Sequence, residues 1–350
     1  MQVCRGCCLM SESWPMKLRN KPVTGHSVLL QGLISAFLLL LPSVLLADED
    51  TSHQAQQLIN AMSKASKELN YDGIFVYQRG SQIEAMRLIH KADTDGEHER
   101  MVSLTGHARE VIRDGQSVTC IFPENRSVMV KRNQPKQLLA AQLPQPIEKI
   151  ADFYGFAVSG KDRIADRSTW VVNIVPKDDY RYGYQLWIDE ETKLLLKSEL
   201  RDNSGRPIEQ ILFTHLDVVD HISPDLLKPS ISGPGYTWYS GSAEDTPVSV
   251  HNTEWAVLSM PRGFSQSDHE IQALAEGYMP VEHMVYSDGL AMVSVFIEKI
   301  DKESNEIRGV SRMGGVNTYA TYSNGYQVTA VGEVPLKTVQ SMATSVVQNR

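Results

Sequence analysis

Cysteine is scarce in this 350-residue chain, and its distribution excludes a disulfide framework. Only four cysteines occur, and three of them, Cys4, Cys7 and Cys8, fall within the first eight residues. Cys120 is alone in the remainder of the chain, so it has no internal partner if the amino terminus is removed. Cysteine and histidine spacing typical of a structural zinc site is also missing. Stability must therefore come from ordinary apolar cores.

Sequence signatures of the common enzyme classes are absent as well. The nearest approach to the nucleophile elbow G-x-S-x-G is "GFSQS", residues 263–267, which lacks the second glycine. His269-Glu270 is followed by Ala273 where H-E-x-x-H needs its second histidine, so the paired metal ligands are missing. Phosphate-binding and dinucleotide-binding glycine patterns do not occur. We therefore predict no enzyme activity, no catalytic residues, no cofactor and no metal.

Cys120 is the residue that could still act as a nucleophile, and its neighbours argue against that role. In "SVTCIFP", alternation places Val118, Cys120 and Phe122 on one strand face, which groups the thiol with two apolar side chains. No basic residue lies within five positions to lower the thiol pKa. We expect a buried, unreactive cysteine. The ten histidines are scattered rather than clustered, and Glu97, Glu99 and Glu110 are expected on solvated strand faces beside arginines.

Basic residues are in deficit except at the amino terminus. Lys17, Arg19 and Lys21 precede the apolar run "SVLLQGLISAFLLLLPSVLLA" and the acidic "DED", which is the order of a secretory signal peptide over residues 1–47. A membrane anchor is the alternative, because Val28 to Leu46 approaches the roughly 20 residues that span a bilayer. Translation could also start at Met16.

Removing residues 1–47 leaves 30 basic and 41 acidic residues, a net charge of about −11, so nucleic acid is not an expected partner.

The next segment, residues 48–222, is predicted to be one helix followed by a wide antiparallel sheet. Apolar residues at spacings of three and four over "TSHQAQQLINAMSKASKELNYDG" indicate an amphipathic helix ending before Gly73. Ten short β-branched or aromatic segments follow, joined by hairpin signals such as Asp114-Gly115. Helix-like spacing recurs only in "QPKQLLAAQLPQPIEKIADFYGF". A sheet of this width usually curls around its apolar face into an open or closed barrel.

A proline-containing linker, residues 223–249, is predicted to precede a smaller α+β domain, residues 250–350. Strand patterns recur there, with Asp288-Gly289 and Asn324-Gly325 as hairpin signals. "LKTVQSMATSVVQ" after Pro335 indicates a closing helix. The expected fold class is therefore α+β and mostly antiparallel β, in two domains.

Several long stretches of the chain resemble the MucB/RseB family, the periplasmic regulators of the envelope-stress sigma factor, sigma-E. In the first domain these are "YDGIFVYQRGSQIEAMRLIHK" and "GHAREVIRDGQSVTCIFPE". In the second they are "MPRGF", "PVEHMVYSDGLAMVSVFIE" and "GGVNTYATYSNGYQVTAVGEVPLKTVQSMATSV". The resemblance covers both domains from about Tyr71 to Val347. It implies a periplasmic location and a first domain like the LolA/LolB lipoprotein carriers, an unclosed β-barrel with a covering helix.

The resemblance also implies a function. The smaller domain is expected to bind the periplasmic segment of the anti-sigma factor RseA and to protect it from site-one proteolysis. Lipopolysaccharide, or the acyl chains of mislocalised lipoprotein, would enter the apolar cavity and release that protection. Coupling would need two domain arrangements, which the linker would permit. A periplasmic lipoprotein carrier or chaperone is the alternative function, an exported hydrolase is a third, and self-association into a homo-oligomer is left open.

Candidate site residues follow from the apolar and aromatic content of the strands. Those that could line the cavity of the first domain are Phe75, Tyr77, Leu88, Phe122, Trp170 and Trp187. Those that could anchor a protein partner on the second are Tyr286, Phe296, Tyr319, Tyr322 and Tyr326, because aromatic residues dominate interface energetics. Each could equally be a core residue, since the sequence does not assign strand faces to inside or outside.

Overall fold

The computed structural model of the chain describes residues 45–115, 117–132, 143–231, 235–240, 248–249, 255–272, 280–300 and 308–348. Most of the predicted signal peptide, and the three cysteines within it, lie outside these residues, so the signal peptide stays a prediction. Among the described helices, none combines the length and the apolar character needed to cross a membrane.

A single sheet of twelve strands forms the larger domain within the described residues, and its two edge strands do not pair with each other. Every neighbouring pair is antiparallel except β12 with β6. The spatial order is β12-β6-β5-β4-β3-β2-β1-β11-β10-β9-β8-β7. The strands are β1 (Tyr71–Arg79), β2 (Gln82–Asp93), β3 (Gly96–Ser103), β4 (Glu110–Asp114), β5 (Ser117–Phe122), β6 (Ser127–Arg132), β7 (Tyr154–Ile164), β8 (Arg167–Pro176), β9 (Gly183–Asp189), β10 (Leu195–Arg201), β11 (Pro207–Val218) and β12 (Thr237–Ser240).

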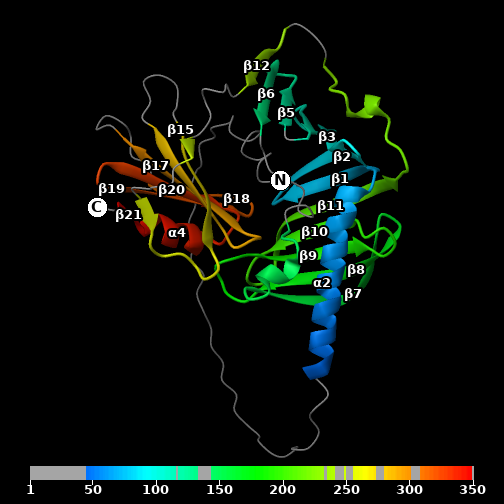
Figure 1. Ribbon diagram of the computed structural model, residues 1–350, viewed down its shortest axis with the longest axis horizontal. Helices are drawn as coiled ribbons and strands as arrows, with labels where there is room; N and C mark the ends of the chain where they lie inside the picture. Colours follow the sequence, from blue (N-terminus) through cyan, green and yellow to red (C-terminus); the bar gives the residue numbers. More distant parts are fainter. Residues whose placement is uncertain are drawn as a thin grey trace, which may run out of the picture.

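Helix α2 (Leu45–Glu68) lies across β7–β11 of this sheet (Figure 1). Its apolar stripe is buried: Ala55, Ile59 and Met62 have no exposed surface, and they pack with residues of β7, β8 and β9. The strands contribute alternate side chains, as the burial of β1 at every second residue shows. The helix thereby fills the concave side of a sheet that does not close on itself, as the family resemblance implies.

The smaller domain contains a sheet of seven strands in the order β13-β15-β16-β17-β20-β19-β18, counted over the described residues. Helix α4 (Leu336–Thr344) packs on one face of it, against β17, β19 and β20 (Figure 1). β14 (Trp255–Val257) and β21 (Val346–Gln348) form a separate pair. The strands of the sheet are β13 (Val248–Ser249), β15 (Ser265–Gln272), β16 (Val281–Ser287), β17 (Met292–Lys299), β18 (Gly309–Met313), β19 (Val316–Ser323) and β20 (Tyr326–Gly332). The expected fold class is confirmed.

The structure differs from the sequence-based expectation around the predicted helical insert. Part of that insert, residues 134–142, lies outside the described residues. Its remaining part forms a single 3-10 turn, η1 (Ile147–Ile150), and then β7, an edge strand that the spacing of Ile147, Ile150 and Phe153 does not indicate. The apolar spacing belongs instead to a turn and a strand that bury Ile147, Ile150 and Tyr154 against α2.

The segment predicted as a linker is partly held on the larger domain. η2 (Pro224–Leu227) lies against β3, where Arg100 Nη1 donates to the carbonyl of Leu226 at 3.0 Å. Ser230 donates its backbone N–H (3.0 Å) and its hydroxyl (2.6 Å) to Glu110 Oε2. Glu110, expected on a solvated face, is therefore only 2 % exposed and also pairs with Arg100, so that expectation is wrong. Glu110 is buried because a segment distant in the sequence packs on it, and the alternation of strand residues gives no sign of that segment.

Candidate functional site

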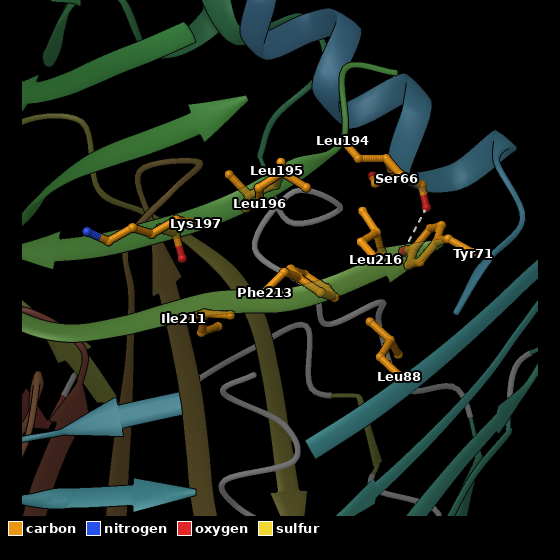
Figure 2. Close-up of a pocket in the computed structure, with 11 residues that line it drawn as sticks. Ser66, Tyr71, Leu88, Leu194, Leu195, Leu196, Lys197, Ile211, Phe213 and Leu216 are labelled. Atoms are coloured by element: carbon orange, nitrogen blue, oxygen red, sulfur yellow. Dashed lines mark hydrogen bonds between the residues drawn. The ribbon is translucent and has the colours of Figure 1, made fainter. Parts of the chain in front are cut away.

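An apolar pocket opens between the carboxyl-terminal half of α2 and the concave side of the large sheet. Figure 2 shows side chains from α2, β1, β2, β10, β11 and the turn before β10 around it. Lys197 belongs to the wall, but its ammonium points away from the pocket in Figure 2 and lies 4.0 Å from the ring of Trp187. The lining consists of Ser66, Tyr71, Leu88, Leu194, Leu195, Leu196, Lys197, Ser198, Ile211, Phe213 and Leu216. Such a lining suits hydrocarbon rather than a charged head group.

Gly73 in the middle of β1 brings two of these residues against the backbone. A Cβ at this position would lie 2.8 Å from both Leu216 Cδ1 and the Phe213 ring. The same Cβ would lie 2.9 Å from the carbonyl oxygen of His215, so a larger residue would displace the backbone of β11 as well as Leu216 and Phe213. The glycine therefore shapes the floor of the pocket.

The space in the pocket is small, about 40 Å³. By the same measure one buried water needs roughly 10 to 15 Å³, so the pocket would hold about three water molecules. A long acyl chain does not fit this space. Because α2 forms one wall, movement of the helix away from β10 and β11 would enlarge the pocket.

The end of the pocket nearest the α2–β1 junction is polar but uncharged. Tyr71 is fully buried, and its hydroxyl lies 3.5 Å from the carbonyl of Ser66. Burial, followed by the nearby carboxylates of Glu99 and Glu97, raises the pKa of Tyr71 well above its usual value, so the phenol stays neutral. His90 stacks on Tyr71 with 4.7 Å between ring centres, and its Nδ1 lies 2.8 Å from the carbonyl of Leu69.

The structure brings three of the six candidate ligand-binding residues together. Phe75, Tyr77 and Leu88 belong to one apolar cluster, and Leu88 lines the pocket directly. Phe75 is 1 % exposed, and its ring packs against that of Phe213 with 5.6 Å between centres.

The other three candidates lie elsewhere on the sheet. Phe122 packs beside the cluster that contains Cys120, and Trp170 packs against the α2 cluster. Trp187 points to the other face of its strand from Leu186 and Ile188, and its Nε1 donates to Asp162 at 2.9 Å. Contact of any of the six with a ligand stays a prediction.

Sequence reasoning missed most of the pocket. Leu194 and Leu196 come from the run "LLLKSEL", and Ile211, Phe213 and Leu216 from "ILFTHL", both of which are identified as strands by their pattern. Alternation pairs Ile211 with Phe213, but it does not tell which face is concave. The position of α2 supplies that information.

The candidate partner residues divide between the two faces of the smaller sheet. Tyr286, Tyr319 and Tyr326 lie on the face that packs with α4, where Tyr286 is 2 % exposed. Burial raises the pKa of Tyr286 above its usual value. Phe296 follows buried Val295 in β17, and Tyr322 is paired with Gln327, which precedes buried Val328 in β20. Because neighbouring residues of a strand point to opposite faces, Phe296 and Tyr322 point away from α4.

This second face, defined here as the Phe296–Tyr322 face, is half-buried and carries polar neighbours. The ring of His283 stacks on Phe296 at 4.3 Å, with an angle of 8° between their planes. His283 Nδ1 lies 3.1 Å from Glu270 Oε1. The guanidinium of Arg308 lies 5.4 Å from the ring of Tyr322. An aromatic surface with polar groups around it is typical of protein interfaces.

Comparison with known proteins matches both domains. A family described as "MucB/RseB N-terminal domain" matches residues 54–231, and "MucB/RseB C-terminal domain" matches residues 249–347. The Haemophilus influenzae protein named "Sigma-E factor regulatory protein RseB" is 27 % identical over 88 % of this chain and 95 % of its own. The Pseudomonas aeruginosa protein named "Sigma factor AlgU regulatory protein MucB" is 29 % identical over 89 % and 96 % respectively.

Solved structures of the same kind of protein resemble this one. One is the complex of Pseudomonas aeruginosa MucA and MucB, with a TM-score of 0.67 and 26 % identity over 85 % of this chain and 99 % of that one. A second, MucB in complex with MucA(peri), has a TM-score of 0.65 and 28 % identity at the same coverage.

Proposed function

The chain belongs to the MucB/RseB family, and we propose that it is a non-enzymatic periplasmic regulator that binds the periplasmic segment of a membrane-bound anti-sigma factor of the RseA type. Binding protects that segment from site-one proteolysis. Acyl chains of lipopolysaccharide or of mislocalised lipoprotein enter the apolar pocket and end the protection.

The proposed binding of the anti-sigma segment rests on the match, over 85 % of this chain, to MucB structures that contain MucA. Both domains take part in that match, which supports a complex of the same kind for this protein. The Phe296–Tyr322 face is the surface of the smaller domain that we assign to the partner, because its aromatic side chains are not used by the α4 core.

The pocket supports the proposed binding of acyl chains. Its lining is almost entirely hydrocarbon, and each methylene transferred from water to such surroundings contributes about 0.8 kcal/mol. Burying four to six methylenes would therefore contribute roughly 3 to 5 kcal/mol before the cost of moving α2. That range favours binding of an acyl chain over binding of a compact polar ligand.

Binding of the anti-sigma segment is tested by calorimetry. The mature protein is titrated with the periplasmic segment of the anti-sigma factor from the same organism. We expect saturable binding, weakened about tenfold or more by Phe296→Ala and by Tyr322→Ala, since aromatic anchors at interfaces commonly contribute about 2 kcal/mol or more. Tyr239→Ala is the matched control, because Tyr239 is 58 % exposed on the larger domain. Absence of binding by the unmodified protein would refute the proposal.

Digestion of the anti-sigma segment by the site-one protease tests the protection. The mature protein should slow cleavage, and lipopolysaccharide or a triacylated lipopeptide should restore it. If neither lipid restores cleavage while the complex still forms, the protein regulates the anti-sigma factor without sensing lipid.

A lipoprotein carrier is the second candidate, because the α2-covered pocket would suit it equally. A carrier transfers an acylated protein from donor to acceptor membranes and has no need of the Phe296–Tyr322 face. Transfer that survives Phe296→Ala, in a protein that does not bind the anti-sigma segment, would favour the carrier.

A further inference from the structure

A buried arginine joins the two domains. Arg181, in the turn before β9, has no exposed surface, and its Nη1 donates to Asp288 Oδ2 of the smaller domain at 2.8 Å. Its Nη2 donates to the carbonyl of Arg262, also in the smaller domain, at 2.6 Å. Tyr154 of the larger domain donates to the same Asp288 oxygen at 2.9 Å. Nε of Arg181 also donates to Asp178 of the larger domain at 3.1 Å, so Asp288 is the charge that loses its ionic partner when the domains separate. Removing the partner of a buried charge is costly, which favours the closed arrangement.

The turn that carries Asp288 also enters the apolar core of the larger domain. Leu290 packs against the cluster that contains Ile59 and Met62 of α2. Gly289 has φ +99°, and a Cβ there would lie 2.8 Å from Ile150 Cγ2, so its backbone rests directly on η1. The β16–β17 turn, residues 288–290, is therefore in contact with the same cluster that positions α2.

Helix α2 is bonded to η1 through one side chain. Asn60 Oδ1 accepts the backbone N–H of Ile147 at 3.0 Å, and Asn60 Nδ2 donates to Glu148 at 3.1 Å. Six residues further along α2, Ser66 lines the apolar pocket. A continuous series of contacts thus runs from the pocket through α2 and η1 to the 288–290 turn and Arg181.

The linker does not offer an independent hinge over its first half, because residues 224–230 are bonded to β3 and β4 and β12 is paired with β6. A change in domain arrangement must break contacts between the domains, and these include Arg181 with Asp288, Tyr182 with Asn317 and Glu209 with Gly315.

We propose that α2 and η1 connect the pocket mechanically to this joint, so that filling the pocket opens it. The inference rests on the proposed binding of acyl chains. A chain larger than the 40 Å³ pocket displaces α2 from β10 and β11, because the interior is close-packed. Asn60 carries the displacement to η1, which moves Ile150 against Gly289 and separates Asp288 from Arg181. Packed interfaces change between discrete arrangements rather than deforming smoothly, so a small shift of α2 suffices.

The experiment measures acyl-chain binding and domain separation independently in the mature protein. cis-Parinaric acid, a fluorescent 18-carbon fatty acid, reports binding. Nitroxide labels on Glu191→Cys of the larger domain and Gln340→Cys of the smaller one report the separation by pulsed electron paramagnetic resonance. Both positions are exposed, whereas Cys120 is 1 % exposed and escapes labelling.

Asn60→Ala removes the hydrogen bonds between α2 and η1, and it leaves their apolar packing and the pocket lining in place. Asn60→Ser is the substitute if the alanine variant does not fold. Asn173→Ala is the matched control, since the Asn173 side chain bonds to Gln185 of the neighbouring strand at 2.9 Å and not to η1. We expect cis-parinaric acid to shift the label separation in the unmodified protein and in Asn173→Ala. Asn60→Ala should bind the probe within about twofold of the unmodified affinity and keep the ligand-free separation. Asp288→Asn should show the shifted separation without probe.

Binding without a change in separation would overturn this connection and leave the proposed lipid binding standing. The connection is equally overturned if Asn60→Ala shifts as the unmodified protein does. No binding of the fatty acid at all would overturn the ligand half of the proposed function and the connection together.

Discussion

Tyr77 and Glu209 share a hydrogen bond that links the sheet to the smaller domain. The Tyr77 hydroxyl donates to Glu209 Oε2 at 2.6 Å, and Oε1 of the same carboxylate accepts the backbone N–H of Gly315 at 2.7 Å. Glu209 is 6 % exposed, so both bonds are shielded from water. Hydrogen bonds to a buried charge are about twice as strong as neutral ones. Tyr77 is predicted to contact a ligand, but its hydroxyl is hydrogen-bonded to the carboxylate of Glu209, which also binds the smaller domain.

Tyr77→Phe should lower the free energy of unfolding by about 2 kcal/mol, because it removes one hydrogen bond to a buried charged group. Urea denaturation followed by tryptophan fluorescence measures the loss. Tyr319→Phe is the matched control: it is half-buried in the smaller domain, and we expect a change below about 0.5 kcal/mol. Equal losses in the two variants would show that the bridge contributes nothing particular.

Asp202 should make stability depend on pH at the acid end. Burial alone would raise its pKa, but hydrogen bonds from Ser204 and Arg206 outweigh burial and lower the pKa from 3.8 to about 2. A carboxylate with a depressed pKa in the folded state contributes stability above its unfolded pKa, and that contribution is lost as the pH falls toward about 2.

Asp202→Asn should therefore cost about 1 kcal/mol at pH 7, after allowance for solvent screening of a partly exposed group. The difference from the unmodified protein should shrink as the pH falls below about 4. Urea titrations at several pH values decide the matter, and a difference that stays constant down to about pH 3 would contradict the assignment.

Ser66→Leu should fill the pocket from the α2 side. The added side chain occupies the space between α2 and Leu216, so affinity for cis-parinaric acid should fall about tenfold or more while binding of the anti-sigma segment is unchanged. Ser168→Leu, on an exposed position of β8, is the matched control and should bind the fatty acid normally. Unaltered affinity in Ser66→Leu would place the acyl chain elsewhere.

Cys120 should be chemically silent in the folded protein. It is 1 % exposed and packs with Val111 and Val118, so a thiol-specific reagent such as Ellman's reagent should react only after urea is added. Cys120→Val, which keeps similar volume, should retain binding of the anti-sigma segment. Rapid labelling of the native thiol, or loss of binding in the variant, would reopen a functional role.

Local patterns predicted much of the fold. The period of three to four residues identifies α2, and alternation identifies ten strands of the larger domain and the buried face of Cys120. Asp288-Gly289 and Asn324-Gly325 do connect antiparallel strands. Strand β15 is not indicated by its sequence, because "SQSDHEIQ" has little apolar or β-branched content, and its position beside β16 comes from sheet pairing. Of the pocket lining, only Leu88 is predicted, because alternation separates two faces without saying which one α2 covers.

The sequence by itself determined a leader-like amino terminus, an acidic body without disulfides, the two-domain α+β class and the family resemblance, since these depend on composition and short-range periodicity. Only the tertiary structure decided that Glu110 is buried under Ser230, that α2 forms one wall of the pocket, and that Arg181 bonds to Asp288 across the domain boundary. Each of these contacts joins residues more than a hundred positions apart or depends on how a helix lies on a curved sheet. Side-chain periodicity carries no information on such distances, because it reports the face of an element and not what covers that face.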